Sequence, residues 1–240
     1  MDARQVARQL VIDWHGLFRD RIRSALLFGS VARGEAIPEV SDINVLLLID
    51  HIDAGTLKQA SQCTRKWMKA ALEAPLVFEL EQWRRASDVF AIEIADMIDA
   101  HELLHGEDPL SGATIDEHAL RLQAERELRG KLLQLQTALL VAANTPVDVG
   151  RLLLNSLPSF TAYMRAALRL AGQPVPTSTV EVINHAAGHV GANPAAFLRV
   201  WETRVKRSSF KLAVDDPLVD AYYDTAEKTA DFVDSLRRSS

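Results

Sequence analysis

The apolar run from Ile43 to Ile49 constrains the fold more than any other feature of the sequence. Only Asn44 interrupts this run, so the segment lacks the alternation of a strand that has one face in water. A short and dense apolar run is typical of a strand that is buried on both faces of a sheet. The segment therefore predicts a sheet that other elements cover, which is the arrangement of an α/β domain.

The first half of the chain carries further strand and helix patterns. They predict helices at residues 3–22 and 55–73, a strand at Ser24–Phe28 and a third strand at Leu76–Leu80. Residues 88–105 fit either state, because Ile92 and Ile94 alternate like a strand whereas Met97 and Ile98 suit a helix.

Beyond the turn at Asp108–Gly112 the sequence predicts helices alone. The expected helices are residues 116–143, residues 147–171 with an interruption at Pro158, and two that begin at Asn193-Pro194 and Asp216-Pro217. We therefore expect an α+β protein in two domains. Residues 1–112 would form an α/β domain with a mixed sheet and flanking helices, and residues 113–240 an all-helical domain.

Composition narrows the classes of partner and compartment. The formal net charge is −5 and no long run of lysine and arginine occurs, so a small-molecule substrate is favoured over bulk nucleic acid. The longest apolar run is about a third of the ~20 residues that a membrane span needs. The N-terminus lacks the apolar core of a signal peptide, and Cys63 is the single cysteine, read as structural. These features predict a cytoplasmic protein without a membrane partner, and they leave its oligomeric state open.

Two neighbouring segments carry the side chains that phosphate chemistry needs. Gly29-Ser30 follows the predicted strand at Ser24–Phe28, where glycine allows close approach of a ligand and the next amides can hold phosphate oxygens. Asp42 and Asn44 are two residues apart, so on a strand both side chains would point to one face. Oxygen ligands beside a phosphate cradle are what Mg²⁺ prefers.

The succession Gly29-Ser30, Gly34 and Ser41-Asp42-Ile43-Asn44 resembles the motif of the DNA polymerase β-like nucleotidyltransferase superfamily. That motif is a Gly-Ser pair, a short helix that contains glycine, and a strand with Asp-x-Asp. The resemblance implies a palm domain that transfers a nucleoside monophosphate from a nucleoside triphosphate to an acceptor hydroxyl, with Mg²⁺. The helical half is similar to the domain attached to small bacterial nucleotidyltransferases, which implies a role in choosing the acceptor.

The resemblance also implies roles for individual residues. Gly29, Ser30 and Arg33 would bind the nucleotide, although Arg33 equally suits a solvent-facing position on a helix. Asp42 and Asn44 would bind the metal, and Asp42 together with Glu93 would be catalytic, with Glu93 as a further ligand or as the base on the acceptor. The acceptor remains open among an antibiotic, a protein side chain and a small metabolite, and so does the preferred base of the nucleotide.

The sequence departs from the family pattern at two metal positions. Asn44 replaces the second acid of Asp-x-Asp, and the third acid falls at or near Leu76, which cannot bind a metal. Glu79 and Glu93 are acids within apolar runs and are possible substitutes, each with a salt-bridged structural role as the alternative. These departures favour a second hypothesis, a depleted relative that binds a nucleotide or a partner without turnover.

The segment His101–His105 matches the His-Glu-x-x-His pattern of zinc proteases. That pattern works on a continuing helix, whereas Gly106 follows the second histidine at once. On a strand the two histidines would lie ~13 Å apart, too far to share one zinc ion. We therefore expect no protease site in this segment.

Overall fold

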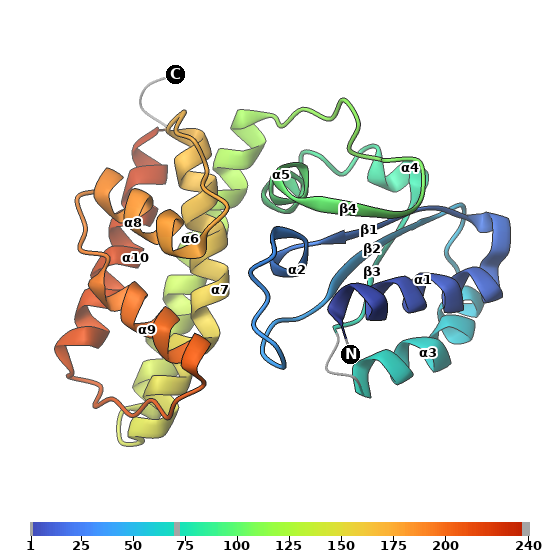
Figure 1. Ribbon diagram of the computed structural model, residues 1–240. Helices are drawn as coiled ribbons and strands as arrows, with labels where there is room; N and C mark the ends of the chain where they lie inside the picture. Colours follow the sequence, from blue (N-terminus) through green and yellow to red (C-terminus); the bar gives the residue numbers. More distant parts are fainter. Residues whose placement is uncertain (1, 70–72, 237–240) are drawn as a thin grey trace. The chain divides into compact units, whose positions relative to one another are not determined.

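The computed structural model describes residues 2–69 and 73–236. These residues form two compact units that divide between Asp116 and Glu117 (Figure 1). All strands of the described residues belong to the first unit, and the second unit is built from helices. This is the α+β class that the sequence predicts, with a mixed sheet followed by a helical region.

The first unit is organised around a four-stranded sheet. Its strands are β1 (Ile22–Phe28), β2 (Asn44–Ile49), β3 (Leu76–Glu79) and β4 (His101–Gly106), and their order is β3-β2-β1-β4. β2 and β3 run parallel, whereas β1 is antiparallel to both β2 and β4. The two strands at the centre, β1 and β2, are the ones that carry the densest apolar runs.

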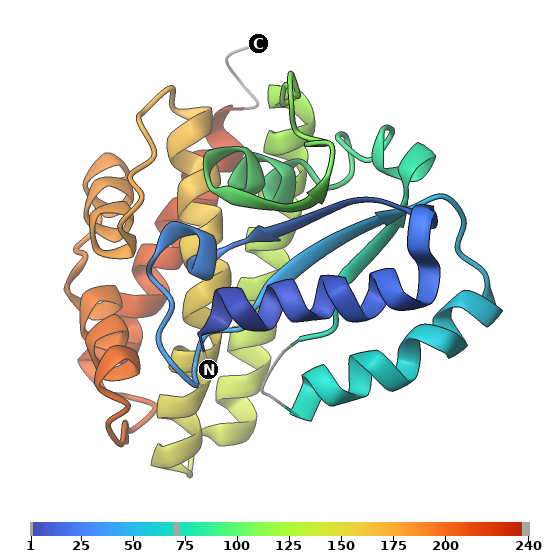
Figure 2. The same ribbon diagram turned by 45° about the vertical axis from the view of Figure 1, so that its right-hand side comes forward.

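Helices cover both faces of this sheet, which explains why β2 is apolar throughout. α1 (Ala3–Phe18) and α3 (Ala54–Lys69) pack on the face that presents Leu27 and Leu47 (Figure 2). The opposite face, with Leu26, Leu46 and Leu48, is covered by α4 (Leu80–Trp83) and α5 (Ala91–Asp99). The remaining helical segments of the unit are η1 (Arg19–Arg21) and α2 (Ser30–Arg33).

Several predicted boundaries shift in the structure. The first helix ends at Phe18 and continues as the turn η1, and β2 begins at Asn44 instead of Ile43. The ambiguous segment 88–105 divides into helix α5 and strand β4, so both readings hold in part. The third strand ends at Glu79 rather than Leu80. The end of the predicted helix 55–73 includes residues 70–72, which lie outside the described residues.

The second unit is a bundle of helices with an aromatic centre. Its helices are α6 (Glu117–Ala142), α7 (Pro146–Leu170), α8 (Thr179–His189), α9 (Ala195–Lys206) and α10 (Pro217–Ser235). Phe197 and Tyr222 stack with ring centroids 4.0 Å apart, and Phe160 meets both rings edge-on. The Tyr222 hydroxyl is 3.0 Å from Ser156 Oγ, so the one polar atom of this fully buried ring is hydrogen-bonded.

The predicted interruption at Pro158 is wrong, because α7 continues through this residue. A proline inside a helix removes the hydrogen bond to the carbonyl four residues earlier, which is that of Leu154. In the structure the Leu154 carbonyl accepts a hydrogen bond from Arg204 Nη1 at 3.1 Å. A side chain of α9 thus replaces the donor that Pro158 lacks, which reduces the cost of a proline within α7.

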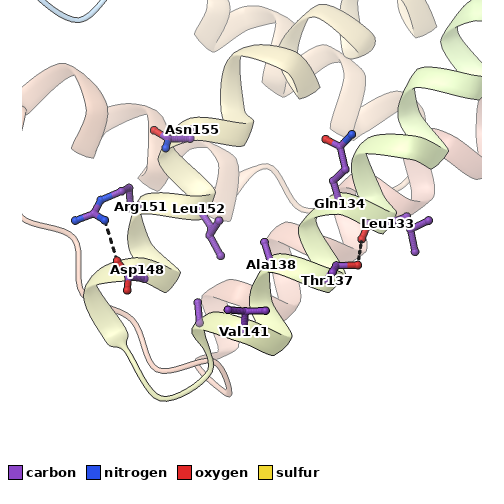
Figure 3. Close-up of a pocket in the computed structure, with 10 residues that line it drawn as sticks. Leu133, Gln134, Thr137, Ala138, Val141, Asp148, Arg151, Leu152 and Asn155 are labelled. Atoms are coloured by element: carbon purple, nitrogen blue, oxygen red, sulfur yellow. Dashed lines mark hydrogen bonds and ion pairs between the residues drawn. The ribbon is translucent and has the colours of Figure 1, made fainter.

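The end of the α6–α7 hairpin presents an apolar groove (Figure 3). The groove has a volume of about 710 Å³. Its apolar lining includes Leu133, Ala138, Val141 and Leu152, and Asp148 and Arg151, which also line it, form an ion pair at 2.8 Å. The sequence carries no charged residue from 132 to 147, which accounts for the apolar surface.

Within the described residues, no helix combines the length and apolar character that crossing a membrane requires.

Candidate active site

A sharp turn follows the end of β1. Gly29 has φ 76° and ψ −151°, a backbone conformation that is essentially restricted to glycine. Helix α2 begins at the next residue and closes on Gly34, whose left-handed backbone (φ 77°) ends the turn of helix. The two glycines that the motif contains are therefore required by the backbone at both ends of α2.

The turn leaves backbone amides available to a ligand. The first hydrogen bond of α2 runs from the Arg33 amide to the Gly29 carbonyl at 3.0 Å. The preceding amides, those of Ser30, Val31 and Ala32, therefore have no acceptor inside the helix, and no side chain caps it. Amides in this arrangement are suited to receive phosphate oxygens.

Asn44 lies directly against this turn. It is the first residue of β2 and pairs with Phe28, the last residue of β1. A Cβ atom placed on Gly29 would be 2.8 Å from Asn44 Nδ2, so the amide of Asn44 occupies the space beside the glycine. The structure thus brings two predicted site residues, Gly29 and Asn44, into one place.

Asp42 precedes the strand instead of lying on it. Because β2 begins at Asn44, Asp42 lies outside the strand, and the two-residue period of a strand does not place its side chain on the face of Asn44. Asp42 is exposed, and the loop before it is held by Ser41, whose Oγ accepts a hydrogen bond from the Ile37 amide at 2.9 Å. Its carboxylate is therefore offered to solvent two residues from Asn44.

The face of β2 that carries Asn44 also carries Leu46 and Leu48, by the two-residue period of a strand. Leu46 pairs with Leu76 in the parallel register of β2 and β3. Leu76 is therefore beside the strand position that follows Asn44 on this face, and its side chain is 42% exposed. A leucine offers no metal ligand there.

Glu79 cannot replace the missing acid. It lies at the far end of β3, opposite Ile49, whereas Asn44 begins β2. Its Oε1 accepts a hydrogen bond from the Ile52 amide at 2.7 Å and is 2.9 Å from His51 Nδ1. The structural role that the sequence left as the alternative is the observed one for Glu79.

Glu93 occupies the first turn of α5 and is half-buried. It lies on a helix and not on a strand, but its neighbours Ile94 and Met97 pack on the sheet face of Leu46. The helix that carries Glu93 therefore covers the same face of the sheet to which Asn44 belongs.

Arg33, at the end of α2, is half-buried, and its enclosed Nε has no hydrogen-bond partner within the described residues.

The His-Glu-x-x-His segment forms β4 and has structural partners. His101 Nδ1 lies 2.8 Å from the Met97 carbonyl and Nε2 lies 3.3 Å from Asp108 Oδ2. Glu102 binds two arginines, Arg4 and Arg8. No group of three or more histidine, cysteine or acidic side chains in the described part of the chain is placed to hold a metal ion.

The donor set of Asp42 and Asn44 is suited to a metal that arrives with its substrate. Mg²⁺ usually binds one or two carboxylates together with substrate phosphates and water. Asp42 could offer one carboxylate and Asn44 one amide oxygen, a donor set that would need nucleotide phosphates to complete the coordination of an ion. A cage of three acids does not fit, because Leu76 takes the third position.

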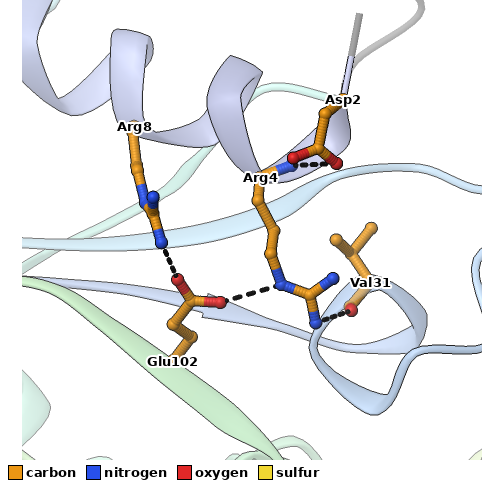
Figure 4. Close-up of polar contacts among 5 residues, drawn as sticks. All are labelled: Asp2, Arg4, Arg8, Val31 and Glu102. Atoms are coloured by element: carbon orange, nitrogen blue, oxygen red, sulfur yellow. Dashed lines mark hydrogen bonds and ion pairs between the residues drawn. The ribbon is translucent and has the colours of Figure 1, made fainter.

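Sequence reasoning did not identify the contact between Arg4 and the turn of helix α2. Arg4 Nη2 donates a hydrogen bond to the Val31 carbonyl at 3.0 Å, and Arg4 Nε donates to Glu102 Oε2 at 3.0 Å (Figure 4). Arg4 and Glu102 are 98 residues apart in the sequence, so no local pattern connects them. Only the fold shows that these side chains reach the motif.

Comparison with solved structures shows the fold. The chain is similar to the spectinomycin adenyltransferase AAD(9) from Enterococcus faecialis, whose crystal structure contains ATP and spectinomycin. The two chains are 11% identical, with a TM-score of 0.59, and the match covers 95% of this chain and 98% of AAD(9). A toxin–antitoxin structure with AMP-PNP is also matched, with 20% identity and a TM-score of 0.30 over 42% of this chain and 74% of that chain.

No protein-family model matches the sequence, and no curated protein sequence matches it. The fold therefore rests on the mixed sheet, the helical unit and the likeness to AAD(9) over nearly the whole of both chains. The chain has the fold of the DNA polymerase β-like nucleotidyltransferases.

Proposed function

We propose that this protein is a nucleotidyltransferase that moves a nucleoside monophosphate from a nucleoside triphosphate to an acceptor hydroxyl. The observation that carries the proposal is the Gly29–Ser30 turn, with its open amides, in contact with Asn44 and close in sequence to Asp42. The Arg33 Nε supports it, because a buried cationic donor without a partner is costly unless an anion such as phosphate supplies the acceptor.

In the proposed reaction, the acceptor oxygen attacks the α-phosphorus of the nucleotide. A bond forms between these atoms, the bond from the α-phosphorus to the bridging oxygen breaks, and pyrophosphate leaves. Glu93 takes the proton of the hydroxyl as general base. It lies in the first turn of α5, and Ile94 and Met97 of this helix pack on the sheet face that carries Leu46. The amides of Ser30 to Ala32 and the Arg33 guanidinium hold the triphosphate and stabilise its charge.

Asp42 and Asn44 would hold Mg²⁺ together with phosphate oxygens of the bound nucleotide. The ion would neutralise negative charge on the phosphates during transfer. Asn44 is neutral, so the metal site has one negative charge fewer than an Asp-x-Asp pair. We therefore propose a weak Mg²⁺ site whose affinity depends on the nucleotide.

The donor and acceptor follow by analogy with the fold neighbour. AAD(9) is a spectinomycin adenyltransferase crystallised with ATP and spectinomycin. We propose a purine nucleoside triphosphate as the donor and a small molecule with a free hydroxyl as the acceptor. This step rests on likeness of fold and not on a residue of this chain.

The test is release of pyrophosphate from ATP or GTP with Mg²⁺ and a panel of hydroxylated antibiotics and metabolites. We expect release that requires both Mg²⁺ and one acceptor, and that is lost in Asp42→Ala and reduced in Glu93→Gln. Release that persists in Asp42→Ala would place the activity outside this site.

A second function is favoured by Leu76 and Asn44. With no acid opposite Leu46 and an amide at position 44, the site could bind a nucleotide without turnover. The substitution Asn44→Asp separates the two functions. If the native chain is an enzyme, the variant changes the Mg²⁺ requirement of an activity that already exists. If the native chain is silent with every acceptor and Asn44→Asp creates turnover, the protein is a binder.

A further inference from the structure

A chain of polar contacts joins the N-terminal helix to the Gly29–Ser30 turn (Figure 4). Arg4 Nη2 donates to the Val31 carbonyl at 3.0 Å, and Arg4 Nε donates to Glu102 Oε2 at 3.0 Å. Arg8 Nη2 donates to the other carboxylate oxygen, Glu102 Oε1, at 2.7 Å. One carboxylate on β4 therefore holds two arginines on consecutive turns of α1, and one of these arginines reaches α2.

The accepting carbonyl belongs to the second residue of a helix of four residues. Such a short helix has few hydrogen bonds of its own, so its orientation depends on contacts from outside. One such contact is the Val31 side chain, which is buried in the core beneath α2, and another is the bond from Arg4 to the Val31 carbonyl. Arg4 therefore fixes the backbone that presents the amides of Ser30 and Ala32.

Glu102 is placed to hold Arg4 in this position. It pairs with Leu27 on β1, one residue before Phe28 and the turn. Its side chain is 29% exposed, and that of Arg4 is 39% exposed, so the pair is only partly accessible to water. Exposed ion pairs contribute little to stability. The carboxylate of Glu102 nevertheless reduces the conformational freedom of the Arg4 side chain, which lowers the entropic cost of the hydrogen bond from Arg4 Nη2 to the Val31 carbonyl.

We propose that Arg4 is a positioning residue of the nucleotide site and that Glu102 holds it in place. Arg4 does not contact the nucleotide. It fixes the Val31 carbonyl, and thereby holds the amides that follow Gly29 in the conformation that binds phosphate. The inference rests on the proposed donor site, and Arg8 provides a matched control because it binds the same carboxylate without reaching α2.

The first experiment measures the backbone of α2 without any ligand. Hydrogen–deuterium exchange is followed for the peptide that contains residues 29–35 in wild type, Arg4→Ala and Arg8→Ala. We expect faster exchange in Arg4→Ala and wild-type exchange in Arg8→Ala. Equal exchange in all three proteins, or equal acceleration in both variants, would overturn the positioning role whether or not the protein binds a nucleotide.

The second experiment titrates ATP with Mg²⁺ by calorimetry into the same proteins. Loss of one charged hydrogen bond that orders the site predicts a rise in Kd of about tenfold in Arg4→Ala. We expect Arg8→Ala to bind as wild type, although both variants lose one ion pair and a similar amount of thermal stability. The variant Arg4→Lys keeps a cationic donor and should recover part of the affinity.

The two experiments separate the two proposals. If wild type binds no ATP but Arg4→Ala still accelerates exchange in residues 29–35, the donor site is rejected and the role of Arg4 in holding α2 is retained. Wild type that binds ATP with the same Kd in Arg4→Ala, Arg8→Ala and wild type would retain the donor site and overturn the role of Arg4.

Discussion

Gly29 is the residue at which backbone geometry and the proposed site coincide. A side chain at position 29 would meet the Asn44 amide at 2.8 Å, in a backbone conformation (φ +76°) that other residues rarely adopt. We predict that Gly29→Ala abolishes ATP binding, because either the turn or Asn44 must move. Calorimetric titration of the variant measures this directly.

Gly112→Ala is the control for Gly29→Ala. Gly112 also has a positive φ (+73°), but no atom lies within 4 Å of a Cβ placed there. Its substitution should cost stability through backbone strain of about 1 kcal/mol and leave the affinity for ATP unchanged. Equal loss of affinity in the two variants would mean that strain, and not the contact with Asn44, disrupts binding.

The sequence predicted the residues of the turn because their chemistry is local. Glycine at positions 29 and 34 indicates a tight approach, whereas the place of Asn44 beside the end of β1 is known only from the strand register of the structure. Asp42 was placed on the strand only because the apolar run does not show where pairing stops. Arg4 and Glu102 could not be predicted, since their contact depends on how α1 and β4 meet in the fold.

The contact between α1 and β4 has a predictable response to pH. The hydrogen bond from Arg8, together with that from Arg4, holds the pKa of Glu102 below its ordinary value of 4.5. A carboxyl with a lowered pKa in the folded state stabilises the protein above its unfolded pKa, and this contribution disappears as the pH falls through the lower folded value. The stabilisation should therefore be complete at neutral pH and decline only below about pH 4.5.

Denaturant unfolding of wild type and Glu102→Gln between pH 7 and pH 3 measures this contribution. We expect a constant difference in the free energy of unfolding at the upper end of the range and a shrinking difference at the lower end. A difference that grows on acidification would contradict the ionised carboxylate as the source.

Helices α6 and α7 each contain a glycine, and the two should respond oppositely to alanine. A Cβ at Gly150 in α7 would lie 2.0 Å from the Phe210 carbonyl oxygen, whereas no atom lies within 4 Å of a Cβ at Gly130 in α6. Gly150→Ala should destabilise the protein by about 1–3 kcal/mol through overpacking. Gly130→Ala should stabilise it by up to about 1 kcal/mol, because alanine favours the helix. Thermal unfolding of both variants tests the pair, and a stabilised Gly150→Ala would show that the loop at Phe210 yields.

Periodicity predicted most of these elements and failed where tertiary contacts decide. Residues 88–105 divide at Ala100 into a helix and a strand, a break that no glycine or proline marks. Pro158 indicated an interruption, but Arg204 of α9 supplies the donor that the proline lacks. In both cases a neighbouring element supplies the information that the local pattern does not contain.

The two-part organisation follows from where strand patterns stop in the sequence. The structure divides into compact units at Asp116 and Glu117, each with its own buried core. We predict that a fragment of residues 117–240 folds alone, because the aromatic cluster around Tyr222 lies entirely within it. Circular dichroism of the fragment should show a helical spectrum and a cooperative thermal transition, whereas a gradual transition would show that the first unit is required.

The proposed function depends on one site, in which Gly29–Ser30 and Asp42 bind a nucleotide together with Mg²⁺. The most direct measurement is a binding titration of ATP, GTP, CTP and UTP, with and without Mg²⁺, on wild type and on the double variant Ser30→Ala with Asp42→Ala. We expect that a purine nucleotide binds, that binding requires Mg²⁺, and that the double variant loses it. Absence of binding at millimolar nucleotide, or binding that the double variant retains, would rule out this site.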